Sequence, residues 1–166
     1  MSLISKDYQA QLQEKHSSDE SWGSTGAQLA PAVLALARGN RDILDYGAGK
    51  RSLERAIGFP IQNYDPGIEE ISKEPVPADT VACIDVLEHI EPEYIEEVLK
   101  DLHRVTKTAA LFLIHTGPAF HILPDGRNAH LIQKPILWWL QMLAPYFEVY
   151  ELKKYGVQYV LVLKPV

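Results

Sequence analysis

Residues 43–50 read Ile-Leu-Asp-Tyr-Gly-Ala-Gly-Lys, and this stretch decides the fold. Its apolar start predicts a short strand over 42–46, and a helix is expected over 52–57, after a turn that contains Gly47 and Gly49. Glycines let the backbone approach a ligand closely, and the start of the following helix offers free N–H groups. The pattern therefore predicts either a site for an adenosine-type cofactor or a plain tight turn between a strand and a helix.

Strands and helices alternate along the rest of the chain. The expected elements are a helix over 24–38 that Pro31 kinks or begins, a strand over 60–64, a loop or at most an edge strand over the Pro-rich 71–80, a strand over 80–84, a helix over 91–107, a strand over 109–115, a helix over 134–143, and strands over 147–153 and 158–163. Only four residues join the last two strands, so these two must be antiparallel. The order predicts an α/β fold, a three-layer Rossmann-like sheet that is mostly parallel, with helices on both faces and a C-terminal antiparallel hairpin strand.

Length and composition exclude several classes of protein. The 166 residues are expected to form a single domain, and the polar segment 1–21 is either an ordered lid or a flexible tail. The longest apolar run, 109–114, is far shorter than a membrane span of about 20 residues, so we expect a cytoplasmic protein without a membrane segment. A net charge of −6 disfavours nucleic acid as a partner, and the single cysteine, Cys83, allows no intramolecular disulfide.

Asp65 lies sixteen residues after Gly49, at the end of the second predicted strand. A carboxylate at a strand end with this spacing can accept hydrogen bonds from both hydroxyls of a ribose. The alternative is that Asp65 only stabilises an Asp-Pro-Gly turn. A nicotinamide dinucleotide site would require a third glycine at position 52, which is Ser52, so the glycine turn fits that cofactor less well.

Residues 79–90 read Asp-Thr-Val-Ala-Cys-Ile-Asp-Val-Leu-Glu-His-Ile, a buried strand that runs into a polar segment. Together with the glycine turn, this segment is similar to the class I S-adenosylmethionine-dependent methyltransferases, specifically the small-molecule type with D-V-L-E-H after the fourth strand. The resemblance extends from about Trp22 to the C-terminus, and the reversed last strand agrees with it. It implies S-adenosylmethionine as the cofactor.

The resemblance also implies which residues contact the cofactor. They are Asp45, Gly47, Ala48 and Gly49 around the methionine part, Asp65 and Pro66 at the ribose, Asp85, Val86 and Leu87 on the sulfonium side, and Trp22 and Gly23 as a turn that closes over the site. Two features depart from the family pattern. Arg51 stands where a third glycine is common, and the Pro-rich 71–80 replaces most of the helix and strand that would supply the adenine pocket.

The loop over 116–131 follows a strand end, where substrate residues belong in such sheets. Its candidate acceptor-binding residues, with the residue before it, are His115, His121, Arg127, Asn128 and His130. No catalytic residue is assigned; the candidates for a general base are His89, His121 and His130. His121, Asp125 and His130 have loose spacing and no further ligand nearby, so no metal site is predicted.

Methyl transfer from a sulfonium needs alignment of donor and acceptor, with help from a base where the acceptor is protonated, and it needs no covalent enzyme intermediate. The sequence accordingly predicts methyl transfer to an unidentified small-molecule or protein acceptor. The alternative is a cofactor-binding module without catalytic activity of its own, which Arg51 and the shortened middle region keep open. The sequence does not indicate an oligomeric state.

Overall fold

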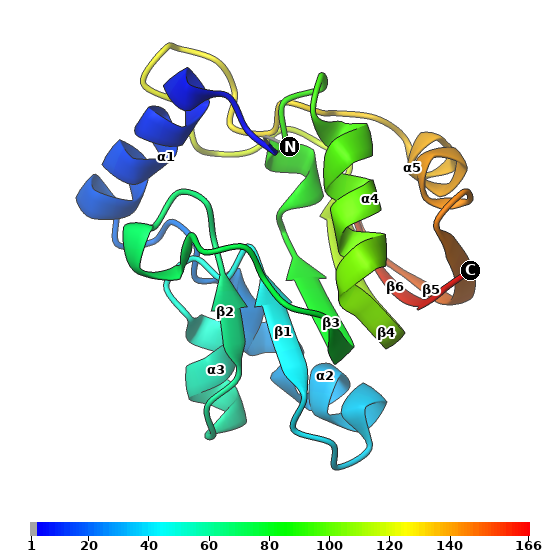
Figure 1. Ribbon diagram of the computed structural model, residues 1–166. Coiled ribbons are helices and arrows are strands. Elements are labelled where there is room, and N and C mark those ends of the chain that lie inside the picture. Colours follow the sequence, from blue (N-terminus) through cyan, green and yellow to red (C-terminus); the bar gives the residue numbers. More distant parts are fainter. Residues whose placement is uncertain (1–2) are drawn as a thin grey trace.

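Six strands form one sheet in the computed structural model, which describes residues 3–166 (Figure 1). Their order across the sheet is β2-β1-β3-β4-β6-β5. The first four in space are parallel, β6 is antiparallel to β4, and β5 is antiparallel to β6. Their bounds are β1 Ile43–Tyr46, β2 Gln62–Tyr64, β3 Ala78–Ile84, β4 Thr106–His115, β5 Phe147–Tyr155 and β6 Gln158–Pro165. The predicted fold class and the antiparallel closing strands are confirmed.

Helices cover both faces of the sheet. The core on one face packs α4 (Ile95–Val105) and α5 (Ile136–Leu143) against the strands, and the core on the other face packs α2 (Ala30–Ala37) and α3 (Ser52–Ile57) (Figure 1). The sequence of α4 shows why it forms. Its buried side chains recur every three or four residues, while its first turn is acidic and its last turn is basic, which suits the helix dipole.

Several helices and strands begin at other residues than predicted. The expected helix over 24–38 is a 3₁₀ helix, Thr25–Leu29, followed by α2, in which Pro31 is the second residue and therefore marks the start. The expected helix over 91–107 begins only at Ile95, because residues 91–94 form a turn in which the Tyr94 N–H donates to the Glu91 carbonyl. β3 and β4 begin earlier than predicted, at Ala78 and Thr106.

The Pro-rich segment contributes a loop. Before Ala78 it forms no strand in the described part of the chain, and Pro75 and Pro77 lack the N–H groups that a strand needs on its paired side. The Asp-Val-Leu-Glu-His segment therefore follows the third strand of this chain, because the Pro-rich segment adds no strand before it.

Helix α1 (Lys6–Ser18) and the loop over 116–131 lie side by side at the carboxyl end of the parallel strands (Figure 1). Tyr8 and Trp22 pack there against Leu123 and Ala129 of the loop. The Ser5 hydroxyl caps α1 at the Tyr8 N–H and also donates to Glu91, at 2.7 Å. Of the segment 1–21, residues 3–21 make these contacts at the sheet edge, and residues 1–2 lie outside the described part.

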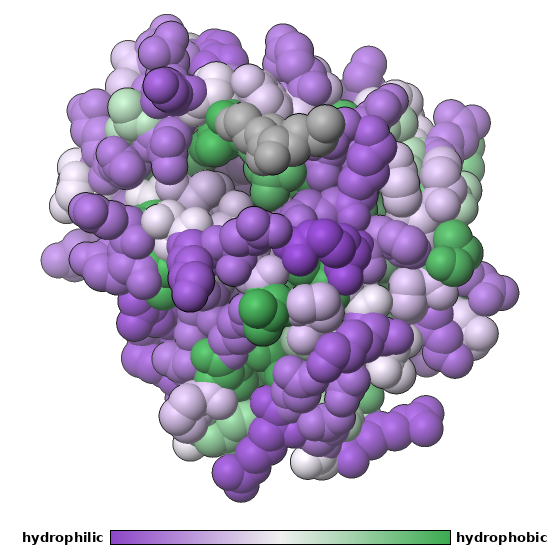
Figure 2. All heavy atoms as spheres, viewed as in Figure 1, coloured by the Kyte–Doolittle hydropathy of each residue, from purple (hydrophilic) through white to green (hydrophobic). Residues whose placement is uncertain are grey.

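The face in Figure 2 is mostly hydrophilic, with hydrophobic residues in small separate groups. Between residues 3 and 166, no helix combines the length and the apolar character that crossing a membrane requires.

Candidate functional site

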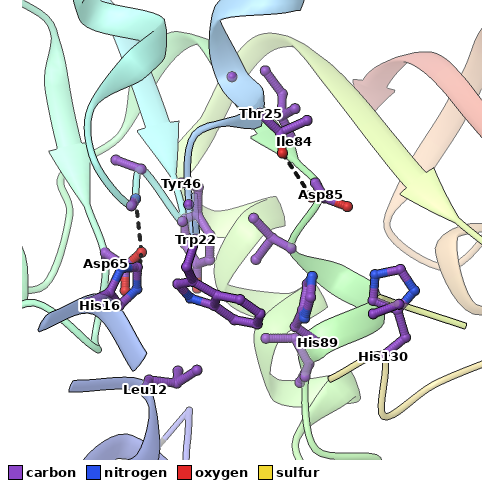
Figure 3. Close-up of a pocket in the computed structure, with 18 of the residues that line it drawn as sticks. Leu12, His16, Trp22, Thr25, Tyr46, Asp65, Ile84, Asp85, His89 and His130 are labelled. Atoms are coloured by element: carbon purple, nitrogen blue, oxygen red, sulfur yellow. Dashed lines mark hydrogen bonds and ion pairs between the residues drawn. The ribbon is translucent and has the colours of Figure 1, made fainter. Parts of the chain in front are cut away.

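A cavity of about 330 Å³ lies at the carboxyl ends of β1, β2 and β3 (Figure 3). Helix α1 and the loop over 116–131 supply its other walls, with Tyr8, Leu12 and His16 from α1 among the lining residues. The volume falls in the range of small-molecule sites, and the position is where open α/β sheets bind ligands. We name its two sides by their residues: the glycine-turn end (Asp45, Gly47, Gly49, Asp65) and the histidine end (Asp85, His89, His115, His121, His130).

The glycine turn needs both of its glycines. Gly49 has a φ of +49°, and a Cβ there would lie 2.6 Å from the Gly23 carbonyl oxygen, which already accepts a hydrogen bond from the Lys50 N–H at 2.9 Å. Gly47 has a φ of +81°, and a Cβ there would lie 2.3 Å from the Val86 side chain. The turn is therefore pressed between the segment around Gly23 and the segment that follows β3.

Asp65 supports the same turn from the end of β2. Its Oδ2 accepts a hydrogen bond from the Gly49 N–H, and its Oδ1 accepts one from the Gly67 N–H, both at 2.9 Å. The local Asp-Pro-Gly turn is thus present. The side chain also lines the cavity together with Asp45, so both carboxylates face one space. Since a carboxylate has about four acceptor positions, Asp65 keeps capacity for further donors from a ligand.

Asp45 is a buried carboxyl group in β1, and no ion pair reaches its side chain within residues 3–166. Burial, with smaller contributions from the charges of Asp65 and Glu54, raises the pKa of Asp45 to about 7. A cation placed at this end of the cavity would stabilise the ionised form of Asp45.

The histidine end begins where β3 ends. Asp85 has a φ of +60°, and its Oδ2 accepts a hydrogen bond from the Thr25 hydroxyl at 2.9 Å (Figure 3). The ring of His89 packs edge-on against the Trp22 indole and against the ring of His130, with centroid distances of 5.1 and 4.7 Å. Figure 3 shows the Trp22 indole between this group and the pair His16 and Asp65, so Trp22 separates the two ends.

Five of the six histidines line this one cavity: His16, His89, His115, His121 and His130. Burial is the main cause that lowers the pKa of His89, to about 4, and burial also lowers the pKa of His130. The Nδ1 of His121 lies 3.3 Å from the Asp19 carboxylate, and the side chain is 37% exposed.

Glu88 fixes the loop that carries His121 and His130. Its side chain is fully buried, and Oε1 accepts a hydrogen bond from the His115 N–H at 2.6 Å, just before the loop. The Glu88 carbonyl accepts from the Ile132 N–H at 3.0 Å, just after the loop. One residue of the Asp-Val-Leu-Glu-His segment therefore holds both ends of the 116–131 loop, a role that the sequence did not indicate.

Most predicted site residues line the cavity. On the side expected to hold the cofactor they are Trp22, Gly23, Asp45, Gly47, Ala48, Gly49, Asp65, Pro66, Asp85 and Val86, and on the other side they are His89, His115, His121 and His130.

Three predicted residues do not line it. Leu87 is fully buried and packs in the core under the sheet. Arg127 is exposed; its guanidinium pairs with Asp125, at 2.7 Å, and lies 5.9 Å from the centre of the Tyr8 ring. Asn128 braces the loop, where its Oδ1 accepts from the Ala119 N–H and its Nδ2 donates to the Ala119 carbonyl.

Sequence reasoning missed the contribution of α1. Tyr8 donates from its hydroxyl to the His89 carbonyl at 2.6 Å, and the His16 Nε2 lies 3.8 Å from the Asp65 carboxylate. Neither residue belongs to a motif, and α1 is hardly amphipathic in sequence, since Tyr8 is its one buried side chain. Thr25 was also missed, and its polar position at the start of a helix gave no sign of its bond to Asp85.

Comparison with known proteins decides the family. A profile described as a methyltransferase domain matches residues 15–155. The chain belongs to this methyltransferase family. The resemblance to class I S-adenosylmethionine-dependent methyltransferases is thereby confirmed, and with it the methyl-transferring enzyme and the cofactor S-adenosylmethionine. No curated protein matches the chain.

Solved structures with low sequence identity share the fold of this methyltransferase. A 1,6-didemethyltoxoflavin-N1-methyltransferase from Burkholderia thailandensis, with bound 1,6-didemethyltoxoflavin and S-adenosylhomocysteine, has 16% identity and a TM-score of 0.70 over 96% of this chain and 89% of that chain. A protein from Pyrococcus horikoshii has 18% identity and a TM-score of 0.64 over 90% and 93%. A magnesium protoporphyrin IX methyltransferase from Synechocystis, with bound S-adenosylhomocysteine, has 17% identity and a TM-score of 0.57 over 84% and 83%.

Proposed function

We propose that this enzyme methylates a small molecule, which binds at the histidine end of the cavity while S-adenosylmethionine binds at the glycine-turn end. The observation that carries the proposal is the cavity itself. One cavity joins two carboxylates, Asp45 and Asp65, to a group of imidazoles, with Trp22 between them. The first end suits a cationic donor with a ribose, and the second suits an acceptor that carries a hydroxyl or amino group.

Each proposed contact at the glycine-turn end has a physical reason. The Asp65 carboxylate would accept hydrogen bonds from the ribose hydroxyls while Gly49 and Gly67 hold it in place. The ionised Asp45 would balance the positive charge of the methionine part, since no cationic side chain is among its bonded partners in the described residues. Gly47 and Ala48 would bring backbone against the ligand, because their N–H groups are engaged with the Tyr64 carbonyl on the other side.

The cover over the cavity favours a small acceptor. Helix α1 is attached on both sides, through the Tyr8 hydroxyl on the His89 carbonyl and the Gln9 amide on the Pro66 carbonyl. The side chain of a large protein would have to pass this cover, whereas a small molecule needs only a transient opening. The neighbouring structure with bound 1,6-didemethyltoxoflavin shows that this fold accommodates such an acceptor in another enzyme.

Calorimetry with S-adenosylmethionine tests the donor end. Asp65→Ala is expected to weaken binding by about 100-fold or more, because it removes two bonds to a charged group, which contribute about 1.5–3 kcal/mol each. Asp79→Ala, which removes a carboxylate at the opposite end of β3, is the matched control and leaves affinity unchanged. Equal affinity in Asp65→Ala and in the unaltered enzyme would contradict the ribose assignment.

Incubation with methyl-labelled S-adenosylmethionine and a cell extract tests the acceptor class. After separation by mass, label in the low-mass fraction is expected. Label confined to macromolecules would overturn the small-molecule proposal while leaving the donor site intact.

A further inference from the structure

Three side chains at the histidine end turn their ligand atoms toward a single point. Asp85, His89 and His130 each offer one oxygen or nitrogen, and these atoms all lie within 4.8 Å of one another. The three come from different segments: the residue after β3, the 3₁₀ helix Leu87–His89, and the loop over 116–131. Figure 3 shows them around one side of the cavity, opposite Asp65.

Hydrogen bonds fix the protonation of both imidazoles. The Nδ1 of His89 lies 2.8 Å from the Ala129 carbonyl oxygen, and the Nδ1 of His130 lies 2.7 Å from the Gly117 carbonyl oxygen. A carbonyl oxygen can only accept, so each Nδ1 must carry the hydrogen. In the neutral ring the other nitrogen, Nε2, then carries a lone pair. Each imidazole thus offers one acceptor nitrogen, and the nearby Asp85 carboxylate is an acceptor as well.

We propose that Asp85, His89 and His130 bind a divalent first-row transition-metal ion such as Zn²⁺, Fe²⁺ or Co²⁺. Two imidazoles and one carboxylate form the ligand set that such ions prefer, and a set of three protein ligands leaves a position open for a water or a substrate. The proposal replaces the expectation from sequence of no metal, and its ligands differ from the trio His121, Asp125 and His130 considered there.

The surroundings have the second layer of contacts that metal sites need. Metal-binding histidines usually donate their other N–H to a carbonyl or carboxylate, which orients the ring, and both rings here do so. The Thr25 hydroxyl donates to Asp85 Oδ2 at 2.9 Å and so orients the carboxylate. The other candidate histidines lack this arrangement: His121 faces Asp19, and the Nδ1 of His115 both contacts the Gly117 carbonyl and accepts from the Gly117 N–H.

The role of the ion rests on the proposed function. An ion at this place would bind the acceptor through an oxygen atom at its open position and favour loss of the hydroxyl proton to water. That oxygen would then form a bond to the methyl carbon as the bond between this carbon and sulfur breaks, and S-adenosylhomocysteine would leave. The acceptor class would then be an alcohol, phenol or hydroxy acid. Binding of the ion itself does not depend on the methyl donor.

Titration of the metal-free enzyme with Co²⁺, followed by visible absorption, tests the site directly. One equivalent is expected to bind, with d–d bands of a low-coordinate site. His130→Ala and Asp85→Asn should each weaken binding by more than about 100-fold, the upper end of what loss of an outer contact costs. Asn tolerates the positive φ at position 85, so Asp85→Asn should keep the fold, which circular dichroism verifies. His103→Ala removes the one histidine outside the cavity and should leave Co²⁺ binding unchanged.

Three outcomes would overturn the proposal. They are no binding of Co²⁺ or of Zn²⁺ at millimolar concentration, undiminished binding in a folded His130→Ala, and an equal loss of binding in His103→Ala. Calorimetry with S-adenosylhomocysteine on the same proteins separates this result from the donor site. His130→Ala should keep S-adenosylhomocysteine binding and lose Co²⁺, whereas Asp65→Ala should do the reverse. A failure of one site therefore leaves the test of the other intact.

Discussion

The two ends of the cavity are built by different means. The glycine-turn end comes mainly from one continuous stretch, β1, the turn and the start of α3, and backbone contacts such as Lys50 N–H to Gly23 hold it. The histidine end is assembled from separate segments, and side chains such as Glu88 and Tyr8 hold it. We infer that the first end tolerates no added atoms, while the second depends on bonds that can be removed one at a time.

The largest effect is expected from Gly49→Ala. A methyl group there would overlap the Gly23 carbonyl oxygen at 2.6 Å, in a backbone conformation that already costs alanine about 1–2 kcal/mol. Overpacking adds about 1–3 kcal/mol, so we expect the free energy of unfolding to fall by about 2–5 kcal/mol and S-adenosylhomocysteine binding to be lost. Urea unfolding and calorimetry measure the two effects.

Gly58→Ala is the matched control for this prediction. Gly58 also has a positive φ, +83°, but a Cβ there would meet nothing within 4 Å. Only the conformational cost of about 1–2 kcal/mol should appear, and cofactor affinity should not change. If the free energy of unfolding fell equally in the two variants, the backbone conformation alone would account for the loss, and the close contact with Gly23 would not contribute.

Glu88→Ala tests the other end. It leaves the buried His115 N–H without an acceptor, which costs about 1–3 kcal/mol in the free energy of unfolding. Because the glycine turn makes no bond to Glu88, affinity for S-adenosylhomocysteine should change little. Hydrogen exchange should become faster at the start of the 116–131 loop, because the substitution removes the bond from the His115 N–H to Oε1, whereas the backbone bond between the Glu88 carbonyl and the Ile132 N–H remains. Glu93→Ala, on an exposed residue nearby, should change neither quantity, and a strong loss of cofactor affinity in Glu88→Ala would mean that the two ends are not independent.

The same difference explains what could be read from the sequence. The strand, the turn and the helix around Gly47 are neighbours in the chain, so local rules locate them, and β1 and α3 fall within a residue of their predicted bounds. The loop histidines were predicted only as a group, because their positions depend on contacts with distant segments. Arg127 and Asn128 were expected to face a substrate. Instead, Arg127 pairs with Asp125, and Asn128 bonds to the backbone of Ala119. Such choices depend on the loop path, which local patterns do not encode.

The role of helix α1 could not be predicted from local sequence patterns either. Its polar sequence gives almost no periodic signal, and it becomes part of the site only through individual bonds, such as Gln9 to the Pro66 carbonyl. Conversely, Asp85 and His89 were found through the motif, but their convergence with His130 requires the fold of the 116–131 loop.

Asp45 offers a pH-dependent test of the glycine-turn end. Its pKa is raised from 3.8 to about 7 in the folded enzyme. The contribution of Asp45 to the free energy of unfolding is therefore fully present below about pH 4 and is lost as the pH rises toward 7. Asp45→Asn removes the titration, so its stability relative to the wild type should increase between pH 4 and 7 and then level off. Urea unfolding at pH 5 and pH 8 measures this, and a relative stability that does not change with pH would mean that Asp45 ionises normally.

Cofactor affinity should change with pH in the opposite direction to stability, again because of Asp45. A cationic donor favours ionised Asp45, so affinity for S-adenosylmethionine should increase as the pH rises through about 7, by at most tenfold for each pH unit. Asp45→Asn should show weaker affinity without this slope. Calorimetry in buffers of different ionisation enthalpy would detect the proton that the wild type releases.

The smallest effect is expected where α1 joins the two ends. Tyr8→Phe keeps the buried ring and removes only the bond from its hydroxyl to the His89 carbonyl, worth about 1 kcal/mol. If α1 is a lid, this change should speed the release of S-adenosylhomocysteine by about fivefold in stopped-flow measurements, because opening must break that bond. Tyr150→Phe, on an exposed ring of β5, should leave release unchanged. Loss of stability in Tyr8→Phe with an unaltered release rate would instead identify α1 as a fixed wall of the cavity.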